Sequence, residues 1–183
     1  MCHDLENRVF AWLRADPARL EALALAERLH LADWCLAAGF VRNLVWDRLH
    51  GYTHPTPLDD IDLVYFDSRD DSAARDRELE TYLSAVSNLP WSVKNQARMH
   101  ERNGDAPYRS TCDAMTYWVE RETAVGVQLG REGDMSMVAP FGLASLLEGK
   151  VTYNPRCRNR AAFRERSRRK AWLSIWPRLV VVG

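Results

Sequence analysis

Three aspartates gather within four residues, in the run Asp59-Asp60-Ile61-Asp62, at the start of a strand-forming segment that ends at Phe66. Residues i and i+2 of a β-strand point to the same side, so we expect Asp60 and Asp62 to face together while Ile61 turns into the core. Two neighbouring carboxylates raise each other's pKa unless a cation lies between them. Mg²⁺ or Mn²⁺ would relieve that conflict, with substrate phosphates completing the coordination. Alternatively, the acids are solvated turn residues that begin the strand.

Apolar spacing and capping residues predict the elements that position these acids. The predicted helices cover residues 4–15, 17–29, 41–49, 72–86, 110–118, 141–147 and 159–175. The predicted strands cover residues 61–66, 91–97, 123–129 and 135–138, and the last two are joined by a turn at residues 130–133. Strands that alternate with helices predict a single α/β or α+β domain.

Motifs upstream of the acids have a recognisable order. Ala38-Gly39-Phe40-Val41-Arg42-Asn43 is followed by Leu49-His50-Gly51 and then by Asp60-Ile61-Asp62. This order resembles the signature of the DNA polymerase β nucleotidyltransferase superfamily, whose tRNA-nucleotidyltransferase branch reads G-G-x-V-R-D, L-x-G and D-x-D. Ala139–Leu143 (A-P-F-G-L) and Lys170–Pro177 (K-A-W-L-S-I-W-P) extend the resemblance over nearly the whole chain, to an uncharacterised bacterial nucleotidyltransferase-like family.

The resemblance implies a nucleotidyltransferase fold of the α/β (α+β) class, with a small mixed sheet flanked by helices and with helical N-terminal and C-terminal segments. We expect one domain over residues 1–183. Within it, residues 1–30 form a helical N-terminal segment and residues 31–100 form the core with the Gly39 turn and the D-x-D. Residues 101–183 form a C-terminal α/β elaboration that ends in a basic helix.

The resemblance also implies roles for single residues. Nucleotide binding falls to Ala38, Gly39, Arg42 and Asn43, because the turn at Gly39 lets backbone amides approach a triphosphate at a helix N-terminus. Asp60 and Asp62 would be catalytic and would hold Mg²⁺ or Mn²⁺. For Arg42, a structural salt bridge to one of these two aspartates is the alternative.

Members of the superfamily place a third acid on a following strand, and the matching segment here, residues 91–97, contains none. Asn95 takes its place as a catalytic candidate, since an amide oxygen can coordinate a metal although it cannot act as a base. Glu101 and Asp113 are other acids that would have to fold back toward the D-x-D.

The charge of the chain is uneven although its 25 basic and 25 acidic residues cancel. Residues 156–178 hold nine basic residues and one acid, so this segment carries +8 and the preceding residues carry −8. Net neutrality excludes a general polyanion binder. The basic helix either presents a phosphate-binding face, for a nucleotide or a nucleic acid, or is solvated and paired with the acidic remainder.

Three functions are compatible with these features. The first is a metal-dependent transferase that passes a nucleotide monophosphate from a nucleoside triphosphate (NTP) to the hydroxyl of an unidentified acceptor (small molecule, protein or RNA). The second is an inactive nucleotide sensor or interaction module with the same fold. The third, less favoured, is a nucleic-acid-binding module that uses the basic helix.

The chain is expected in the cytoplasm and not in a membrane. It shows no signal peptide and no apolar run of the roughly 18 residues that a membrane span needs. Its four cysteines (Cys2, Cys35, Cys112, Cys157) include no C-x-x-C pair, so we expect reduced thiols.

Overall fold

The computed structural model describes residues 2–183, except the side chains of Cys2, Ser167 and Arg169. The strands are β1 (Cys35–Ala37), β2 (Ile61–Tyr65), β3 (Trp91–Asn95), β4 (Gly126–Leu129), β5 (Met135–Val138), β6 (Lys150–Thr152) and β7 (Val180–Val182). Five of them form a mixed sheet in the order β3-β2-β1-β4-β5, in which only β2 and β3 run parallel. A small mixed sheet with flanking helices was the predicted fold class, and it is confirmed.

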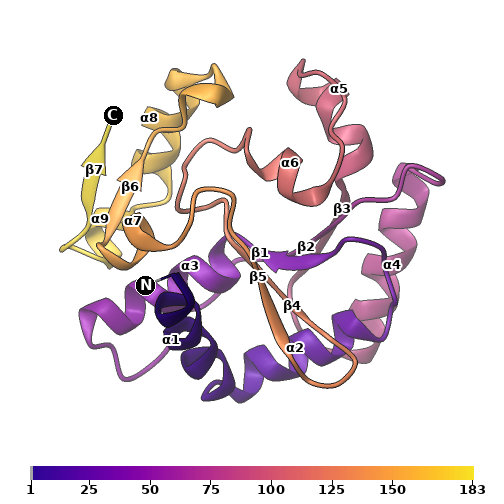
Figure 1. Ribbon diagram of the computed structural model, residues 1–183, viewed down its shortest axis with the longest axis horizontal. Coiled ribbons are helices and arrows are strands. Elements are labelled where there is room, and N and C mark those ends of the chain that lie inside the picture. Colours follow the sequence, from indigo (N-terminus) through magenta and orange to yellow (C-terminus); the bar gives the residue numbers. More distant parts are fainter. Residues whose placement is uncertain (1) are drawn as a thin grey trace.

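Helices surround this sheet (Figure 1). They are α1 (Cys2–Arg14), α2 (Pro17–Glu27), α3 (Gly39–His50), α4 (Ala73–Val86), α5 (Met99–Asn103), α6 (Thr111–Met115), α7 (Ala144–Leu147), α8 (Arg160–Arg169) and α9 (Trp172–Ile175), with 3-10 turns at η1 (Gln96–Arg98) and η2 (Pro155–Cys157). Helices α1 to α4 lie together along one face of the sheet. On the opposite side, α5 and α6 stand apart from the C-terminal elements α7 to α9, β6 and β7.

Side-chain alternation along β2 decides which residues meet which layer. Ile61, Leu63 and Tyr65 join the main hydrophobic core beneath α1 to α4. Val64 packs instead on the opposite face, in a small cluster that includes Met115 of α6. Asp62 lies on this second face with Val64, as period-two alternation requires. The thinner cover on the second face leaves room for a site above β2.

The predicted C-terminal helix is two helices, which corrects the expectation of one continuous helix over residues 159–175. Ala171 has a left-handed backbone conformation (φ 49°) and ends the run between α8 and α9. That conformation costs roughly 1–2 kcal/mol for a residue other than glycine. The bend brings Trp172 and Trp176 edge-on to Trp46, at ring separations of 5.5 and 5.1 Å. Burying each indole is worth about 4 kcal/mol, which exceeds the cost of the bend.

Other boundaries also differ from the predictions. The strand predicted over residues 91–97 ends at Asn95, because that side chain accepts from Ala97 N and begins η1. The helices predicted over residues 110–118 and 141–147 shorten to α6 and α7, and the strand predicted over residues 123–129 shortens to β4. Helix α5 and the parallel pair β6–β7 were not predicted. These elements are three to five residues long, and β6 and β7 are far apart in the sequence, so the periodicity of apolar residues gives little signal. Across the described residues, no helix combines the length and apolar character that a membrane span requires.

Candidate active site

The three aspartates line one side of a cavity of about 250 Å³, here called the acid cleft. Its walls are formed by Ala38, Gly39, Arg42, Asn43, Thr56, Pro57, Leu58, Asp59, Asp60, Asp62, Arg166, Lys170, Trp172, Ile175 and Trp176. Helix α3 contributes its first turn. Asp59 and Asp60 come from the segment that leads into β2, and Asp62 comes from β2 itself. The C-terminal segment closes the third side. Every residue predicted to bind nucleotide or metal therefore lies around one space.

Asp62 has an electrostatic environment that disfavours a bare carboxylate. Burial and then the neighbouring charge of Asp60 raise the pKa of Asp62 to about 6, although Arg42, a hydrogen bond with Ser92 and the charge of Lys170 oppose the shift. Two carboxylates that compete in this way are a donor set that a divalent cation fits, with phosphate and water oxygens as further ligands. The described residues contain no group of three or more His, Cys, Asp or Glu side chains placed to hold a metal. A cation here would therefore depend on substrate oxygens.

Helix α3 begins at the mouth of the acid cleft. Ala38 precedes the helix with φ 56°, in the region of positive φ that glycine favours. Gly39 is the first helical residue, and a Cβ placed there would meet only ordinary van der Waals contacts, at 3.5 Å or more from Arg42 and Asn43. The protein's own packing therefore does not require glycine at position 39. A ligand that approaches the backbone amides at the helix N-terminus would require it.

Arg42 is buried, and the cleft holds it firmly. Its Nη1 donates to Thr123 Oγ1 at 2.7 Å, and its Nε and Nη2 donate to Asn43 Oδ1 at 3.3 and 3.1 Å. The guanidinium also lies over the rings of Trp46 and Trp172, at 5.0 and 4.6 Å. Burial lowers the pKa of Arg42 to about 10, while the charges of Glu120 and the two aspartates oppose that shift. Among the described residues it forms no direct ion pair with Asp60 or Asp62, so the predicted salt bridge is absent.

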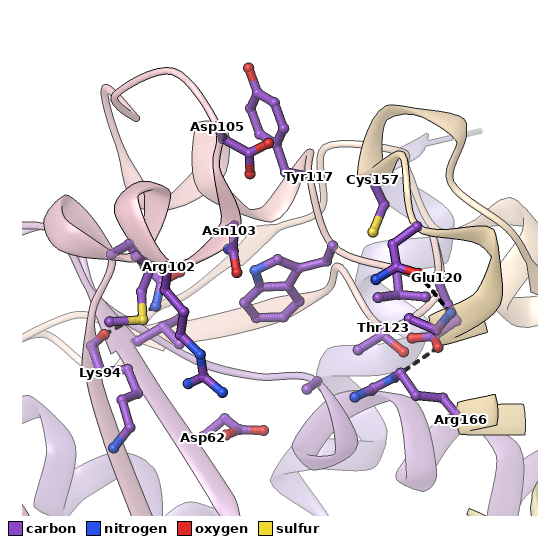
Figure 2. Close-up of a pocket in the computed structure, with 18 residues that line it drawn as sticks. Asp62, Lys94, Arg102, Asn103, Asp105, Tyr117, Glu120, Thr123, Cys157 and Arg166 are labelled. Atoms are coloured by element: carbon purple, nitrogen blue, oxygen red, sulfur yellow. Dashed lines mark hydrogen bonds and ion pairs between the residues drawn. The ribbon is translucent and has the colours of Figure 1, made fainter. Parts of the chain in front are cut away.

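A second cavity of about 560 Å³, here called the large cavity, lies beside the acid cleft (Figure 2). Ala38, Asp62 and Arg166 line both spaces. The remaining walls come from β2, β3, α5, the segment after α6, and α8, and they are Val64, Lys94, Gln96, Met99, Arg102, Asn103, Asp105, Tyr117, Trp118, Val119, Glu120, Thr123, Cys157, Asn159 and Ala162. Asp62 therefore lies where the two cavities adjoin.

Similarity to known proteins identifies this arrangement. A protein-family model described as nucleotidyltransferase matches residues 24–181, which include all the residues of the acid cleft. The chain belongs to this nucleotidyltransferase family. The resemblance found in the motifs is thus confirmed, and the matched region runs from within α2 to within β7. No curated protein matches.

Solved structures agree with this family assignment. An NMR structure that reveals a CCA-adding enzyme head domain superimposes with a TM-score of 0.81 at 32% identity, covering 96% of this chain and 94% of that one. The Bacillus stearothermophilus CCA-adding enzyme in complex with CTP gives 0.56 at 15% identity, over 92% of this chain and 41% of that one. A CCA-adding enzyme with ATP gives 0.58 at 14% identity, over 94% and 41%. The present chain spans about two fifths of the length of these two enzymes. At 14–15% sequence identity, they support the fold alone.

Asn95 does not line the acid cleft with Asp60 and Asp62, so the geometry does not support its predicted catalytic role. In the parallel register Asp62 pairs with Ser92, whereas Asn95 pairs with Tyr65. Asn95 has the same strand parity as the core residue Val93, on the face opposite to Asp62. Its amide is fully used, donating to the carbonyls of Asp67 and Asp70 at 2.8 and 3.1 Å.

The other acids suggested for the third position also lie elsewhere. Asp113 accepts from the Arg109 backbone at 3.0 Å, and its own backbone amide donates to Ser110 Oγ, which caps α6. Glu101 is exposed on α5 and lines neither cavity. The β3 residue beside Asp62 is Ser92, and none of the acids suggested for the third position lies there.

Sequence reasoning missed Glu120, which lies outside the motifs. This buried carboxylate lines the large cavity and accepts from Arg166 Nε at 3.0 Å (Figure 2). Its second oxygen, Oε2, is buried without a hydrogen-bond partner among the described residues. No local pattern marks Glu120, because its partner Arg166 is 46 residues away.

The basic helix α8 divides its charges between two sides. Arg166 and Lys170, spaced i, i+4, reach the acid cleft, and Lys170 Nζ lies 3.4 Å from Asp59 Oδ2. Arg164 and Arg168 are exposed and line neither cavity around Asp62. The sequence left open whether this helix faces phosphate or solvent, and the structure shows one side at the acid cleft and the other exposed.

Proposed function

We propose that the protein transfers a nucleotide monophosphate from an NTP to an acceptor hydroxyl, using Mg²⁺ or Mn²⁺ held by Asp60 and Asp62. The observation that carries the proposal is the single cleft that joins these carboxylates, the amide end of α3 at Gly39, and the cations Arg166 and Lys170. Carboxylates for metal, amides for phosphate and cations for leaving charge are the parts that phosphoryl transfer requires.

Each part has a defined task in this reaction. Bound at Asp60 and Asp62, the metal would neutralise charge on the triphosphate and on the attacking oxygen. The Gly39 amides and Lys170 would hold the terminal phosphates, so that the leaving pyrophosphate lies in the acid cleft. The acceptor oxygen then forms its bond to the α-phosphorus and releases its proton to water, while the bond from that phosphorus to pyrophosphate breaks. The acceptor stays unassigned among small molecules, proteins and RNA, and the proposal includes a cytoplasmic location.

Isothermal titration calorimetry with each of the four NTPs, in Mg²⁺ or Mn²⁺, tests the proposal. We expect metal-dependent binding by the native chain and a loss of at least tenfold in Asp60→Asn and Asp62→Asn. Asp71→Asn serves as the matched control, because Asp71 is an exposed acid that lines neither cavity. Incubation with labelled NTP and acceptor mixtures then measures transfer. Binding and transfer that ignore both site substitutions would refute the proposal.

One observation favours an alternative: the position beside Asp62 on β3 carries Ser92 in place of an acid. A nucleotide sensor or interaction module with this fold would bind NTP and metal without turnover. It predicts that NTP raises the melting temperature in native protein but not in Asp60→Asn, while no acceptor yields product. Introduction of the missing acid as Ser92→Asp would then leave transfer absent, whereas recovered transfer would show that the scaffold is catalytically competent.

The nucleic-acid-binding alternative depends on the outer side of α8, where Arg164 and Arg168 are exposed. Arg169 is a third arginine that could take part, and its side chain lies outside the described residues. Phosphate contacts by these arginines would give binding that weakens steeply with salt and falls when they are neutralised. A flat salt response would exclude this function.

A further inference from the structure

The large cavity lies next to the acid cleft, and this adjacency limits what occupies it. Ala38, Asp62 and Arg166 belong to the walls of both spaces. Under the proposed function, the β- and γ-phosphates lie in the acid cleft, near Gly39 and Lys170. The α-phosphate then lies beside Asp62, at the junction. Whatever is bonded to the α-phosphate must continue away from the cleft, toward the large cavity.

The chemistry of the large cavity differs from that of the acid cleft. Trp118 and Met99 provide partly exposed apolar surface, and Val64 closes the floor from β2. The Asn103 side chain points into the space from α5 (Figure 2), where its Nδ2 donates to the Tyr108 hydroxyl at 3.1 Å. An aromatic surface beside amide groups is how proteins bind a nucleobase, by stacking on its face and by hydrogen bonds to its edge.

Two cations line the large cavity but not the acid cleft. Figure 2 shows Arg102 and Lys94 on the Asp62 side of the large cavity. Arg102 is exposed and forms no hydrogen bond or ion pair with the rest of the described chain. Lys94 Nζ has only the Val93 carbonyl at 2.9 Å and a loose pair with Glu80 at 3.7 Å. Cations with spare donors beside Asp62 suit the non-bridging oxygens of an α-phosphate.

Size and desolvation also favour this division. At about 560 Å³, the large cavity falls in the range of roughly 300–1,000 Å³ that is typical of small-molecule sites. The acid cleft, at about 250 Å³, is lined by three aspartates, whose charges a metal-bound triphosphate neutralises and a neutral base does not. A triphosphate with its metal suits the smaller space, and a nucleoside suits the larger one.

We infer that the large cavity is the nucleoside-binding site, in which the base of the NTP stacks on Trp118 and meets the Asn103 amide while Arg102 contacts the α-phosphate. This inference rests on the proposed function and adds to it that one domain holds the whole nucleotide. The acceptor hydroxyl approaches from the open side of Asp62.

Inorganic tripolyphosphate separates the two spaces experimentally, because it carries the phosphates without a nucleoside. Calorimetric titrations in Mg²⁺ compare it with ATP, GTP, CTP and UTP. We expect at least one NTP to bind roughly tenfold or more tightly than tripolyphosphate, which is the contribution of one stacked base. Trp118→Leu and, separately, Asn103→Ala remove that difference and leave tripolyphosphate binding unchanged, whereas Lys170→Ala weakens both ligands.

Two controls keep the comparison interpretable. Tyr82→Ala removes an exposed aromatic ring on α4 that lines neither cavity, so it leaves both affinities unchanged. Circular dichroism checks folding, and Asn103→Ala, at an exposed position, serves if Trp118→Leu fails to fold.

Each contrary outcome has a distinct meaning. Equal affinity for tripolyphosphate and every NTP, unchanged in Trp118→Leu and Asn103→Ala, overturns the nucleoside site and leaves the triphosphate cleft standing. Normal NTP binding with lost transfer in these variants assigns the large cavity to the acceptor and also overturns the inference. Absence of binding by both ligands refutes the proposed function and this inference with it.

Discussion

Lys170 and Asp59 lie 111 residues apart in the sequence, and their Nζ and Oδ2 atoms are 3.4 Å apart in the structure. Asp59 is largely exposed, so the pair adds little to stability. The pair marks where the basic C-terminal segment lies, next to the aspartates at the start of β2. Because Lys170 is attracted weakly to Asp59, its charge stays available to a phosphate.

Lys170→Ala is expected to weaken binding of NTP and of tripolyphosphate by about tenfold, because a charge-assisted contact to phosphate is lost. Calorimetry measures the loss, and a thermal melt is expected to change little. Arg168→Ala provides the control, since Arg168 lies on the same helix, is exposed and lines neither cavity around Asp62. Equal effects of the two substitutions would mean that α8 acts only through its overall charge.

Gly39→Ala separates stability from binding. The added methyl group meets ordinary contacts at 3.5 Å or more, and alanine favours the helix over glycine by up to about 1 kcal/mol. We expect the free energy of unfolding to stay equal or to rise in urea titrations, while NTP affinity falls at least tenfold because the methyl group blocks approach to the α3 amides. Unchanged affinity would show that phosphate does not approach the backbone at this point.

Asp62→Asn is expected to stabilise the metal-free protein at neutral pH. Because folding raises the pKa of Asp62 to about 6, the carboxyl favours the folded state only when protonated. Its contribution is complete below the unfolded pKa near 4 and is lost as the pH rises through about 6. At pH 7 to 8 we expect Asp62→Asn to exceed the native free energy of unfolding by about 2 kcal/mol.

The pH dependence supplies the control for this prediction. Urea titrations from pH 4 to pH 8 are expected to show that the advantage of Asp62→Asn disappears toward pH 4, where the native carboxyl is protonated. An advantage that stayed constant across this range would show that the substitution acts through packing and not through the charge of Asp62.

Trp176→Ala is expected to lower the free energy of unfolding by about 3–5 kcal/mol, because the indole is buried against Trp46 and its Nε1 donates to Asp47 Oδ1 at 2.8 Å. NTP affinity is expected to fall as well, since this contact anchors the segment that carries Lys170. Leu173→Ala, in the helix α9 that precedes Trp176, is the matched control. Leu173 is half exposed, so truncation of its side chain costs less than about 1 kcal/mol. Chemical denaturation and calorimetry provide the two readouts.

The residues of the acid cleft near β2 were predictable from the sequence because local rules govern them. Strand parity places Asp62 on the face opposite to Ile61, and the resemblance of the motif that begins at Ala38 places Gly39 at a helix N-terminus. The same two-residue alternation marks Asn95 as a core-facing residue, since it points to the same face as the core residues Trp91 and Val93.

By itself, the sequence indicated the family through its motifs and the order of most elements through local patterns of apolar and capping residues. The motif resemblance also indicated that Asp60 and Asp62 lie near Gly39. Only the tertiary structure decided that Ala171 breaks the basic helix, that Lys170 faces the acids while Arg168 faces solvent, and that Glu120 meets Arg166. The physical reason is that burial of Trp172 and Trp176 against α3 fixes the direction of the C-terminal chain. No local pattern reveals this packing energy, since Trp46 lies far in the sequence from Trp172 and Trp176.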